Sequence, residues 1–381
     1  MKRTLSLPIF FLFSRLVLFL SVPFDSITGY GDLGHFYGWA ALDGWPFLDY
    51  WLEFPPIFPF LAEFVYRLVA GRETAFVYVL GGLFSLAEAG SIALFLRIAR
   101  VIMAEAADRA GWLYFAFSLP LFYGWAYFDP LAVFLLLLGI WLTLKNRAVL
   151  AGLAFGVGAL VKWFPLLGLA ALLRVRGPRW VRPLLVGAGL LVIVWGALYL
   201  VSPEFTRASL QSQGAKGSWE TVWALLDQNL VTGNFGAKEE RYDPEMALIP
   251  QGAEAVVPPG AALIPFALLG LWLYLRSRLT TPRSEVAFTG LALTLFFLWS
   301  PGWSPQWVVY LTPLILLTLP ERTATLMAAA LILVNLLEWP LLLSRGMFGA
   351  LWLTVPLRTL LLAGLAVEFW RLIPRGRLQL M

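Results

Sequence analysis

The feature that most constrains this chain is a nearly continuous series of apolar stretches, separated by short connections rich in Arg, Pro or Gly. Spanning a bilayer takes about 20 apolar residues per helix, and hydropathy picks out about twelve candidate helices. These are 5–22, 74–96, 111–127, 130–145, 148–161, 163–174, 182–201, 257–276, 284–300, 306–319, 323–342 and 350–370. The sequence therefore predicts an all-α polytopic membrane protein.

Composition supports the same class. Of the 381 residues, 60% are hydrophobic and 13% are charged, a balance that a soluble domain of this size could not bury. The chain has no cysteine, which rules out disulfides and thiolate metal sites. Residues 1–22 have a basic start and an apolar run without a small-residue cleavage site, so we expect a retained first helix. We expect one transmembrane domain over residues 1–381.

Basic residues gather in alternate connections, at 97–110, 145–147, 174–182 and 276–283, and again at Arg322 and in the C-terminal tail. The intervening connections are acidic and aromatic. By the positive-inside rule, both termini are predicted to lie in the cytoplasm of a plasma-membrane protein. The two long segments 23–73 and 202–256 would then lie outside.

The first outer segment contains YGDLGHFYGWAALDGWPFLDYWLEFPP at residues 30–56, with four carboxylates and the only histidine of the chain. Acidic groups among aromatic residues at a membrane surface are costly to desolvate, which indicates a ligand site. The following stretch, 57–73, is interrupted by Pro59. We predict a helix on the outer membrane surface there, because a span would place the basic connection 97–110 outside.

Asp32 follows Gly31 and precedes Gly34, so its backbone is free to approach a ligand closely. Such a residue can also be a helix N-cap or a solvated loop carboxylate. Tyr37 and the aromatic residues beside it favour a functional role. A carboxylate near a dry, aromatic-lined cleft is suited to take a proton from a sugar hydroxyl as a general base.

Lys162 lies between the apolar stretches 148–161 and 163–174, each too short to cross a bilayer alone. Half-length helices are tolerated where their ends meet a cavity or other protein. An ammonium group fixed there is suited to bind a phosphate. The alternative is a lysine whose stem follows the apolar surface to the interface without a functional role.

Three further residues could contact a sugar. Asp129 precedes a proline, as turn-forming residues often do, and has either that role or a site role. Trp303 and Gln306 lie in SPGWSPQW. Their indole and amide groups could hydrogen-bond sugar hydroxyls, or the segment could simply form a turn.

A single histidine does not indicate a metal site, and no spacing rule supports a carboxylate site at Asp32, Asp43 and Asp49, so we predict no metal and no cofactor.

Several short motifs occur in a fixed order along the chain: D-x-x-x-F, G-x-P-F-x-D and E-F-P-P within 30–56, F-D-P-L at 128–131, G-x-x-x-x-x-K-x-x-P-L at 156–166 and S-P-Q-W at 304–307. This ordered set resembles the membrane glycosyltransferases of the GT-C superfamily. It is most similar to the polyprenyl-phosphate-mannose-dependent α-mannosyltransferases of bacteria and archaea. Phe54 and Trp307 depart from that pattern, which leaves the acceptor and the sugar open.

The resemblance implies a GT-C type bundle with surface helices in the first loop. It also implies an inverting transferase that moves a sugar, with mannose as the first candidate, from a polyprenyl phosphate to a hydroxyl of a lipid or glycan acceptor. Asp32 corresponds to the catalytic carboxylate, and Lys162 and the 300–307 connection face the same outer cavity. We assign the leaving phosphate to Lys162, with Arg207 and Arg241 as further candidates. The residues expected to contact the sugar or the acceptor are His35, Tyr37, Asp49, Glu53, Asp129, Trp303 and Gln306.

Two other classes stay open. In a secondary transporter, the intramembrane residues Arg15, Lys162 and Arg358 would mark a substrate or proton path. The chain has no internal repeat, and its acids gather at one face, which argues against this class. A glycan ligase or flippase-like protein of the cell envelope is the third class. A nucleotide-sugar donor is disfavoured because no Gly-rich phosphate loop or DxD motif occurs. We expect membrane lipids as partners and no nucleic acid.

Overall fold

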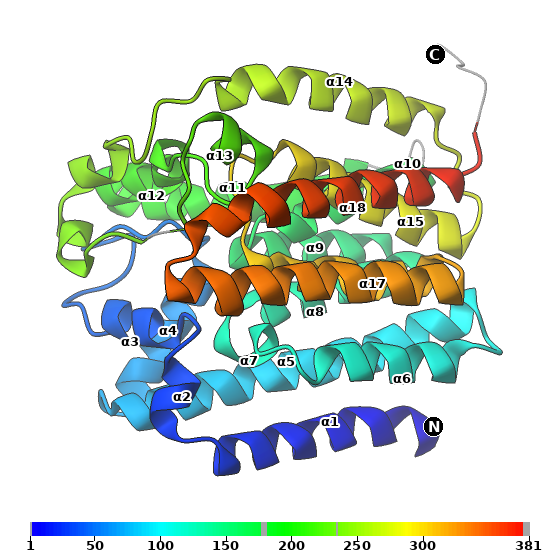
Figure 1. Cartoon of the computed structure of the whole chain (residues 1–381), viewed down its shortest axis with the longest axis horizontal. Coiled ribbons are helices and arrows are strands. Elements are labelled where there is room, and N and C mark those ends of the chain that lie inside the picture. The colour runs from blue at the N-terminus through cyan, green and yellow to red at the C-terminus, as the bar shows by residue number, and fades with distance from the viewer. Residues whose placement is uncertain (1, 177–180, 234, 376–381) are drawn as a thin grey trace.

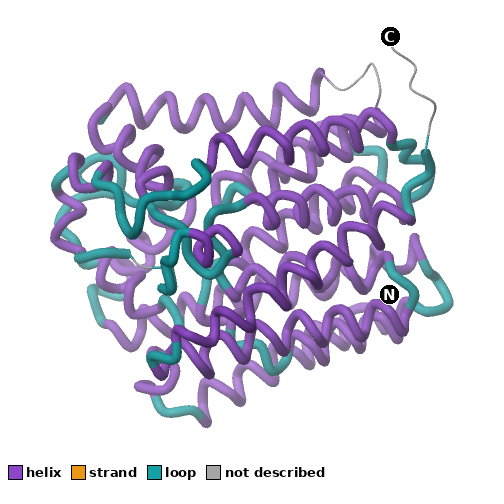
Figure 2. Tube along the Cα trace, turned by 45° about the horizontal axis from the view of Figure 1, so that its top comes forward, coloured by secondary structure: helices purple, strands orange, loops and turns teal. Residues whose placement is uncertain are grey.

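The computed structural model describes residues 2–176, 181–233 and 235–375, and these residues form helices and loops without a β-strand. Figure 2 shows this all-helical character. The α-helices are α1 (Lys2–Ser21), α2 (Phe24–Thr28), α3 (Leu33–Ala40), α4 (Ile57–Leu68), α5 (Glu73–Ile102), α6 (Ala107–Ser118), α7 (Tyr123–Ala126), α8 (Asp129–Leu144), α9 (Ala148–Val161), α10 (Gly168–Arg176), α11 (Val181–Val201), α12 (Pro203–Ala215), α13 (Val222–Leu226), α14 (Pro259–Arg276), α15 (Pro282–Trp299), α16 (Val308–Thr318), α17 (Glu321–Leu336) and α18 (Leu351–Arg371). Short helical turns are η1 (Phe164–Leu167), η3 (Lys238–Tyr242), η4 (Pro244–Leu248), η5 (Pro305–Trp307), η6 (Leu337–Leu342), η7 (Leu343–Arg345) and η8 (Phe348–Ala350).

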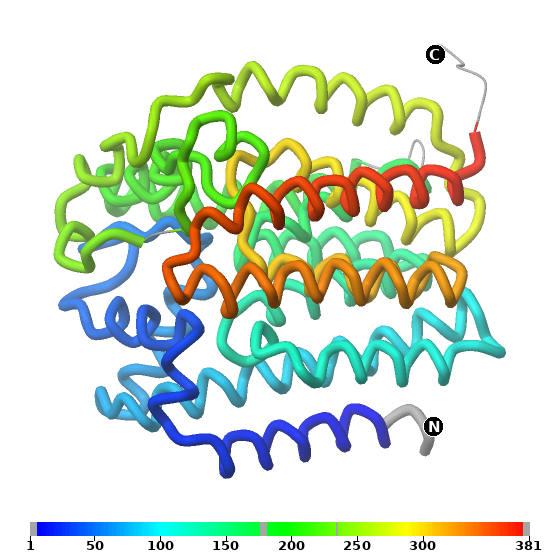
Figure 3. The backbone as a smooth tube through the Cα atoms, in the orientation of Figure 1, coloured from blue at the N-terminus to red at the C-terminus, as the bar shows by residue number. Residues whose placement is uncertain are grey.

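The long helices run side by side in one bundle, and α14 lies along its upper edge in Figure 1. One end, which we call the loop end, carries α2, α3, α4, α12 and α13, at the left of Figure 1. The other, the terminal end, carries the start of α1 and the end of α18, as the backbone trace in Figure 3 also shows. The two long polar segments of the sequence therefore share one end of the bundle.

The helices follow the predicted apolar stretches closely, but the expected count of about twelve spans is not confirmed. Five segments are long and apolar enough to cross a membrane: Glu73–Ile102, Val181–Val201, Pro259–Arg276, Glu321–Arg345 and Phe348–Arg371. Several of the others are shorter; Ala148–Val161, for example, has 14 residues. One stretch, 111–127, divides into α6 and α7 around Pro120, because proline has no backbone N–H to continue the helical hydrogen bonds.

The first loop folds as a layer of short helices at the loop end. Residues 57–68 form α4, a helix of 12 residues, where we predicted a surface helix. Aromatic packing joins this layer to the bundle: the rings of Phe58 and Phe128 stack with centroids 4.1 Å apart, and Phe36 packs on Phe58 at 4.6 Å. This contact fixes α3, α4 and the start of α8 relative to one another.

Lys162 lies at a break in the bundle. The helix α9 ends at Val161, and Lys162 has an extended backbone (φ −157°, ψ 138°) before η1 and α10 return toward the terminal end. Gly156 allows close packing here, since a Cβ at this position would lie 2.7 Å from the Gly187 carbonyl oxygen of α11. The two short helices thus present Lys162 at the loop end.

Candidate active site

Asp32 occupies the N-cap position of α3, and its position is fixed through the residue before it. A Cβ at Gly31 would lie 2.4 Å from the Cβ of Ala126, so only glycine permits this approach. The Asp32 backbone N–H donates to the Ala126 carbonyl at 3.2 Å. The start of α3 is thereby held against the end of α7.

The Asp32 carboxylate does not cap its helix, contrary to the structural alternative for this residue. Within the described residues it makes no hydrogen bond and no ion pair, and the side chain is half-buried. Leu33 is buried, but Gly34 and His35 after it are exposed, so the site is open on this side. Burial raises the pKa of Asp32 to about 7, although the nearby Lys162 and Lys216 act in the opposite direction. Such a carboxyl can accept a proton near neutral pH.

Lys162 and Asp129 form a buried ion pair next to Asp32. The Lys162 Nζ lies 2.7 Å from the Asp129 Oδ1, and Asp129 is 1% exposed. The ammonium also lies over the rings of Phe128 at 4.8 Å and Trp307 at 5.9 Å. The structure therefore brings together the F-D-P-L, K-x-x-P-L and S-P-Q-W segments, which are far apart in the sequence.

A second group of cations lies around Glu53, and the charge of one of them, Lys216, also acts on Asp32. Glu53 accepts a hydrogen bond from Lys216 at 2.9 Å and pairs with Arg241. Burial alone would raise the pKa of Glu53, but these two cations more than offset it and lower the pKa to about 2. Arg241 is fully buried and also donates to the Phe235 carbonyl. Glu53 is therefore ionised and connects the first long loop to the second.

Lys216 is the site residue that the sequence reasoning missed. It follows α12 and lies 5.1 Å from the Phe235 ring and 5.9 Å from the Trp219 ring. Its side chain is 13% exposed and its charge acts on Asp32. The available signal was a single lysine before Gly217 and three residues from a tryptophan, in QGAKGSW.

Three predicted contact residues have partners of their own. His35 packs on Trp39 and Phe235, with ring centroids at 6.1 and 5.1 Å. Tyr37 donates its hydroxyl to the Gly71 carbonyl at 2.9 Å, on the side of α3 that faces α5. The exposed carboxylate of Asp49 accepts from the Trp45 N–H at 2.7 Å and stabilises a turn.

The connection 300–307 is strongly packed. Trp303 is 1% exposed, and its indole N–H donates to the Asn335 Oδ1 at 2.9 Å. Arg358 lies 4.9 Å above its ring and pairs with Glu338. Gln306 is half-buried beside Trp307. Arg207 is exposed on α12 and donates to Gln211 at 3.1 Å, so the structure does not bring it to Asp32.

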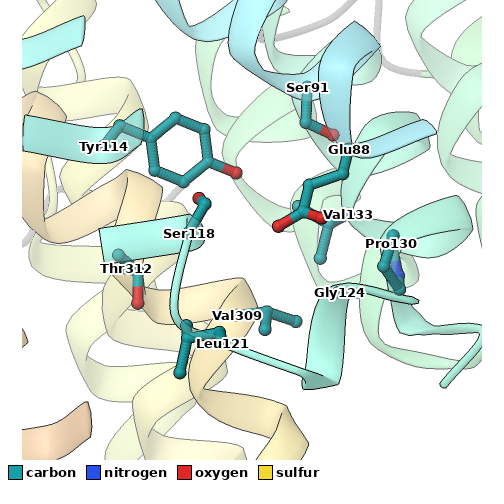
Figure 4. A pocket seen from close by; sticks show the side chains of 10 residues that line it. All are labelled: Glu88, Ser91, Tyr114, Ser118, Leu121, Gly124, Pro130, Val133, Val309 and Thr312. Atoms are coloured by element: carbon teal, nitrogen blue, oxygen red, sulfur yellow. The ribbon is translucent and has the colours of Figure 1, made fainter. Parts of the chain in front are cut away.

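A small cavity inside the bundle is separate from this site. Glu88, Ser91, Tyr114 and Ser118 turn toward a common space in Figure 4. Its volume is about 10 Å³, which suits a single water molecule and not a sugar. Glu88 pairs there with Arg15 at 3.1 Å.

The three intramembrane cations that a transporter would use are thus each paired with a carboxylate: Arg15 with Glu88, Lys162 with Asp129, and Arg358 with Glu338. In the part of the chain that the structure describes, no three acidic or histidine side chains converge to hold a metal ion.

Comparison with known families gives one match. The model of glycosyltransferase family 87 matches residues 55–301, well over half of the chain. The matched region contains Asp129, Lys162 and Lys216, and it begins after Asp32 and Glu53. No match was found among curated proteins or solved structures. Together with the apolar helices, the family match supports a membrane glycosyltransferase. The chain belongs to glycosyltransferase family 87.

Proposed function

We propose that the protein transfers a sugar, with mannose as the first candidate, from a polyprenyl phosphate to a hydroxyl of a lipid or glycan acceptor at the outer face of the plasma membrane. The observation that carries this proposal is the unpartnered Asp32 carboxylate, on which the charges of two ion-paired lysines, Lys162 and Lys216, both act. A base and two cations in one aromatic surrounding are the groups that such a displacement needs.

In the proposed reaction, the acceptor oxygen attacks the anomeric carbon of the donor sugar while its proton passes to Asp32. The bond between the anomeric carbon and the phosphate oxygen breaks, and the electron pair leaves with the polyprenyl phosphate. Lys162 and Lys216 would stabilise the charge on this leaving group. A single displacement inverts the anomeric configuration, and a monophosphate leaving group can be stabilised by cationic side chains.

Transfer of labelled sugar tests this function. Vesicles with the purified protein should move label from polyprenyl-phosphate-mannose into acceptor lipid or glycan, and vesicles without the protein should not. The same sugar supplied on a nucleotide should give no product, because the proposed site binds a lipid phosphate. Transfer from the nucleotide sugar, or failure with polyprenyl phosphates of mannose and of other hexoses, would contradict the proposal.

The outer-face assignment predicts a labelling pattern. Cysteines introduced at Ser26 and Ala253 would both lie exposed at the loop end, and one at Ala104 would lie exposed at the terminal end. The chain has no cysteine of its own to contribute background. An impermeant thiol reagent should label the first two in intact cells and the third only after permeabilisation. The reverse pattern would place the site in the cytoplasm.

A further inference from the structure

The backbone is held on both sides of Gly31, immediately before the candidate base Asp32. On one side, the Asp32 N–H donates to the last carbonyl of α7 at 3.2 Å. On the other side, the Tyr30 carbonyl accepts two hydrogen bonds. The Tyr127 hydroxyl donates one at 3.2 Å, and the Trp339 indole N–H donates the other at 3.0 Å. Both peptide groups that flank Gly31 are therefore fixed.

The two donors to the Tyr30 carbonyl come from different parts of the chain. Tyr127 directly follows α7 and is 5% exposed. Trp339 lies 309 residues after Tyr30, in η6, which follows α17 at the loop end of the bundle (Figure 1). A carbonyl oxygen has two lone pairs and can accept both hydrogen bonds. This one oxygen therefore connects the segment before α3 to α7 and to the end of α17.

Trp339 is itself held in place. Its carbonyl accepts a hydrogen bond from the Tyr123 hydroxyl of α7 at 2.5 Å. The residue before it, Glu338, is 1% exposed and forms an ion pair with Arg358 of α18. The indole N–H is thus presented to the Tyr30 carbonyl from a well-packed part of the bundle.

The position of the Asp32 carboxylate depends on these backbone contacts. Within the described residues the carboxylate has no hydrogen bond or ion pair, so no polar side-chain contact orients it. Gly31 adds conformational freedom just before it, because glycine has no Cβ to restrict the backbone. A general base must lie within hydrogen-bond reach of the proton it takes, and a misplacement of about 1 Å can lower a rate about 10²-fold.

We propose that Tyr127 and Trp339 are positioning residues for Asp32 in sugar transfer, an inference that rests on the proposed function. By holding the Tyr30 carbonyl, they keep the carboxylate within reach of the acceptor hydroxyl. Neither side chain contacts the donor in this role. Removing their donor groups should therefore lower kcat and leave the KM for the donor unchanged.

Phenylalanine variants remove each donor group and keep an aromatic ring. Tyr127→Phe and Trp339→Phe should each lower kcat by a few-fold, because the other donor remains. The double variant should lower kcat by roughly 10²-fold, the cost of a misplaced base. Tyr242→Phe is the matched control, since this hydroxyl bonds the Asp43 backbone N–H at 2.7 Å and not the Tyr30 carbonyl. Its kcat should equal that of the wild type.

The same variants made in Asp32→Asn protein separate positioning from a general effect on folding. If the two donors act through the Asp32 carboxylate, their removal in this background should change the residual rate by less than about twofold, because residues that act as a unit are not additive.

The pH profile gives a second readout. Burial is the largest influence on the pKa of Asp32, which it raises to about 7. A carboxylate released toward water is less buried, so its pKa falls. The rise of rate with pH should therefore move to lower pH in the Tyr127→Phe/Trp339→Phe variant and stay in place in Tyr242→Phe.

The outcomes separate this inference from the proposed function. An unchanged kcat in the double variant, an unshifted pH profile, or the same fold-loss with and without the Asp32 carboxylate would each overturn the positioning role. If the double variant does not fold, the single variants in the two backgrounds make the same comparison. Failure of the wild type to transfer sugar from any polyprenyl phosphate would instead contradict the proposed function.

Discussion

Replacing Asp32 by asparagine is expected to lower the rate of sugar transfer by about 10²–10⁴-fold, the range for a lost general base. The amide keeps the size and polarity of the side chain but cannot take the acceptor proton. Folding should survive, because the Asp32 carboxylate has no hydrogen bond or ion pair within the described residues to lose. Rate and donor binding should be measured on the same protein, and donor binding should be retained.

The pH dependence provides a second measurement on the same variant. The pKa of Asp32 is raised to about 7, so the carboxylate form that acts as a base is half populated at that pH and predominates above it. The wild-type rate should therefore rise with pH toward 7 and level off above it. The residual activity of Asp32→Asn should lack this rise. A flat wild-type profile between about pH 5 and 8 would assign the base to another group.

Asp49→Asn is the matched control, since it makes the same chemical change in the same loop. Asp49 is exposed, and its carboxylate stabilises the turn at Trp45. An amide oxygen can accept the same hydrogen bond, so transfer should stay within a few-fold of the wild type. Equal losses in both variants would show that any change in this loop impairs transfer, and would remove Asp32 from its assigned role.

The helices could be predicted from the sequence because apolar runs in a membrane protein must satisfy their backbone hydrogen bonds internally. The stretch 148–161 coincides with α9 at both ends. The division of 111–127 follows from Pro120, which hydropathy alone does not weigh. The number of spans could not be predicted from the sequence, because several helices are short and tertiary packing decides where they end.

The site was harder to predict, because its charges are paired over long distances in the sequence. Asp32, Asp129 and Lys162 could be selected from their motifs, and the structure places them together. Lys216 could not be selected, since its role depends on Glu53, which is 163 residues away. Arg241 has a suitable charge for phosphate, but burial against Trp51 and pairing with Glu53 already use its guanidinium.

Lys162→Met is expected to reduce both stability and donor binding. The Asp129 carboxylate, 1% exposed, would lose its ion-pair partner, and breaking a buried pair typically costs about 3–5 kcal/mol. The thermal unfolding midpoint in detergent should fall, and so should affinity for polyprenyl phosphate. Lys162→Arg keeps the charge and should retain part of the activity. Reduced transfer alone would not separate a lost phosphate contact from a damaged fold.

The double variant Lys162→Met/Asp129→Asn makes that separation. Neutralising Asp129 removes the unpaired buried charge, so the unfolding midpoint should recover most of its loss. If Lys162 binds the leaving phosphate, donor binding and rate should stay low in the double variant even though its stability has recovered. The pH profile gives a further check: the Lys162 charge lowers the pKa of Asp32 and the Asp129 charge raises it, so the rise should shift to higher pH in Lys162→Met and return toward 7 in the double variant. A double variant that transfers sugar as well as the wild type would show that the pair is structural and that Lys216 holds the phosphate.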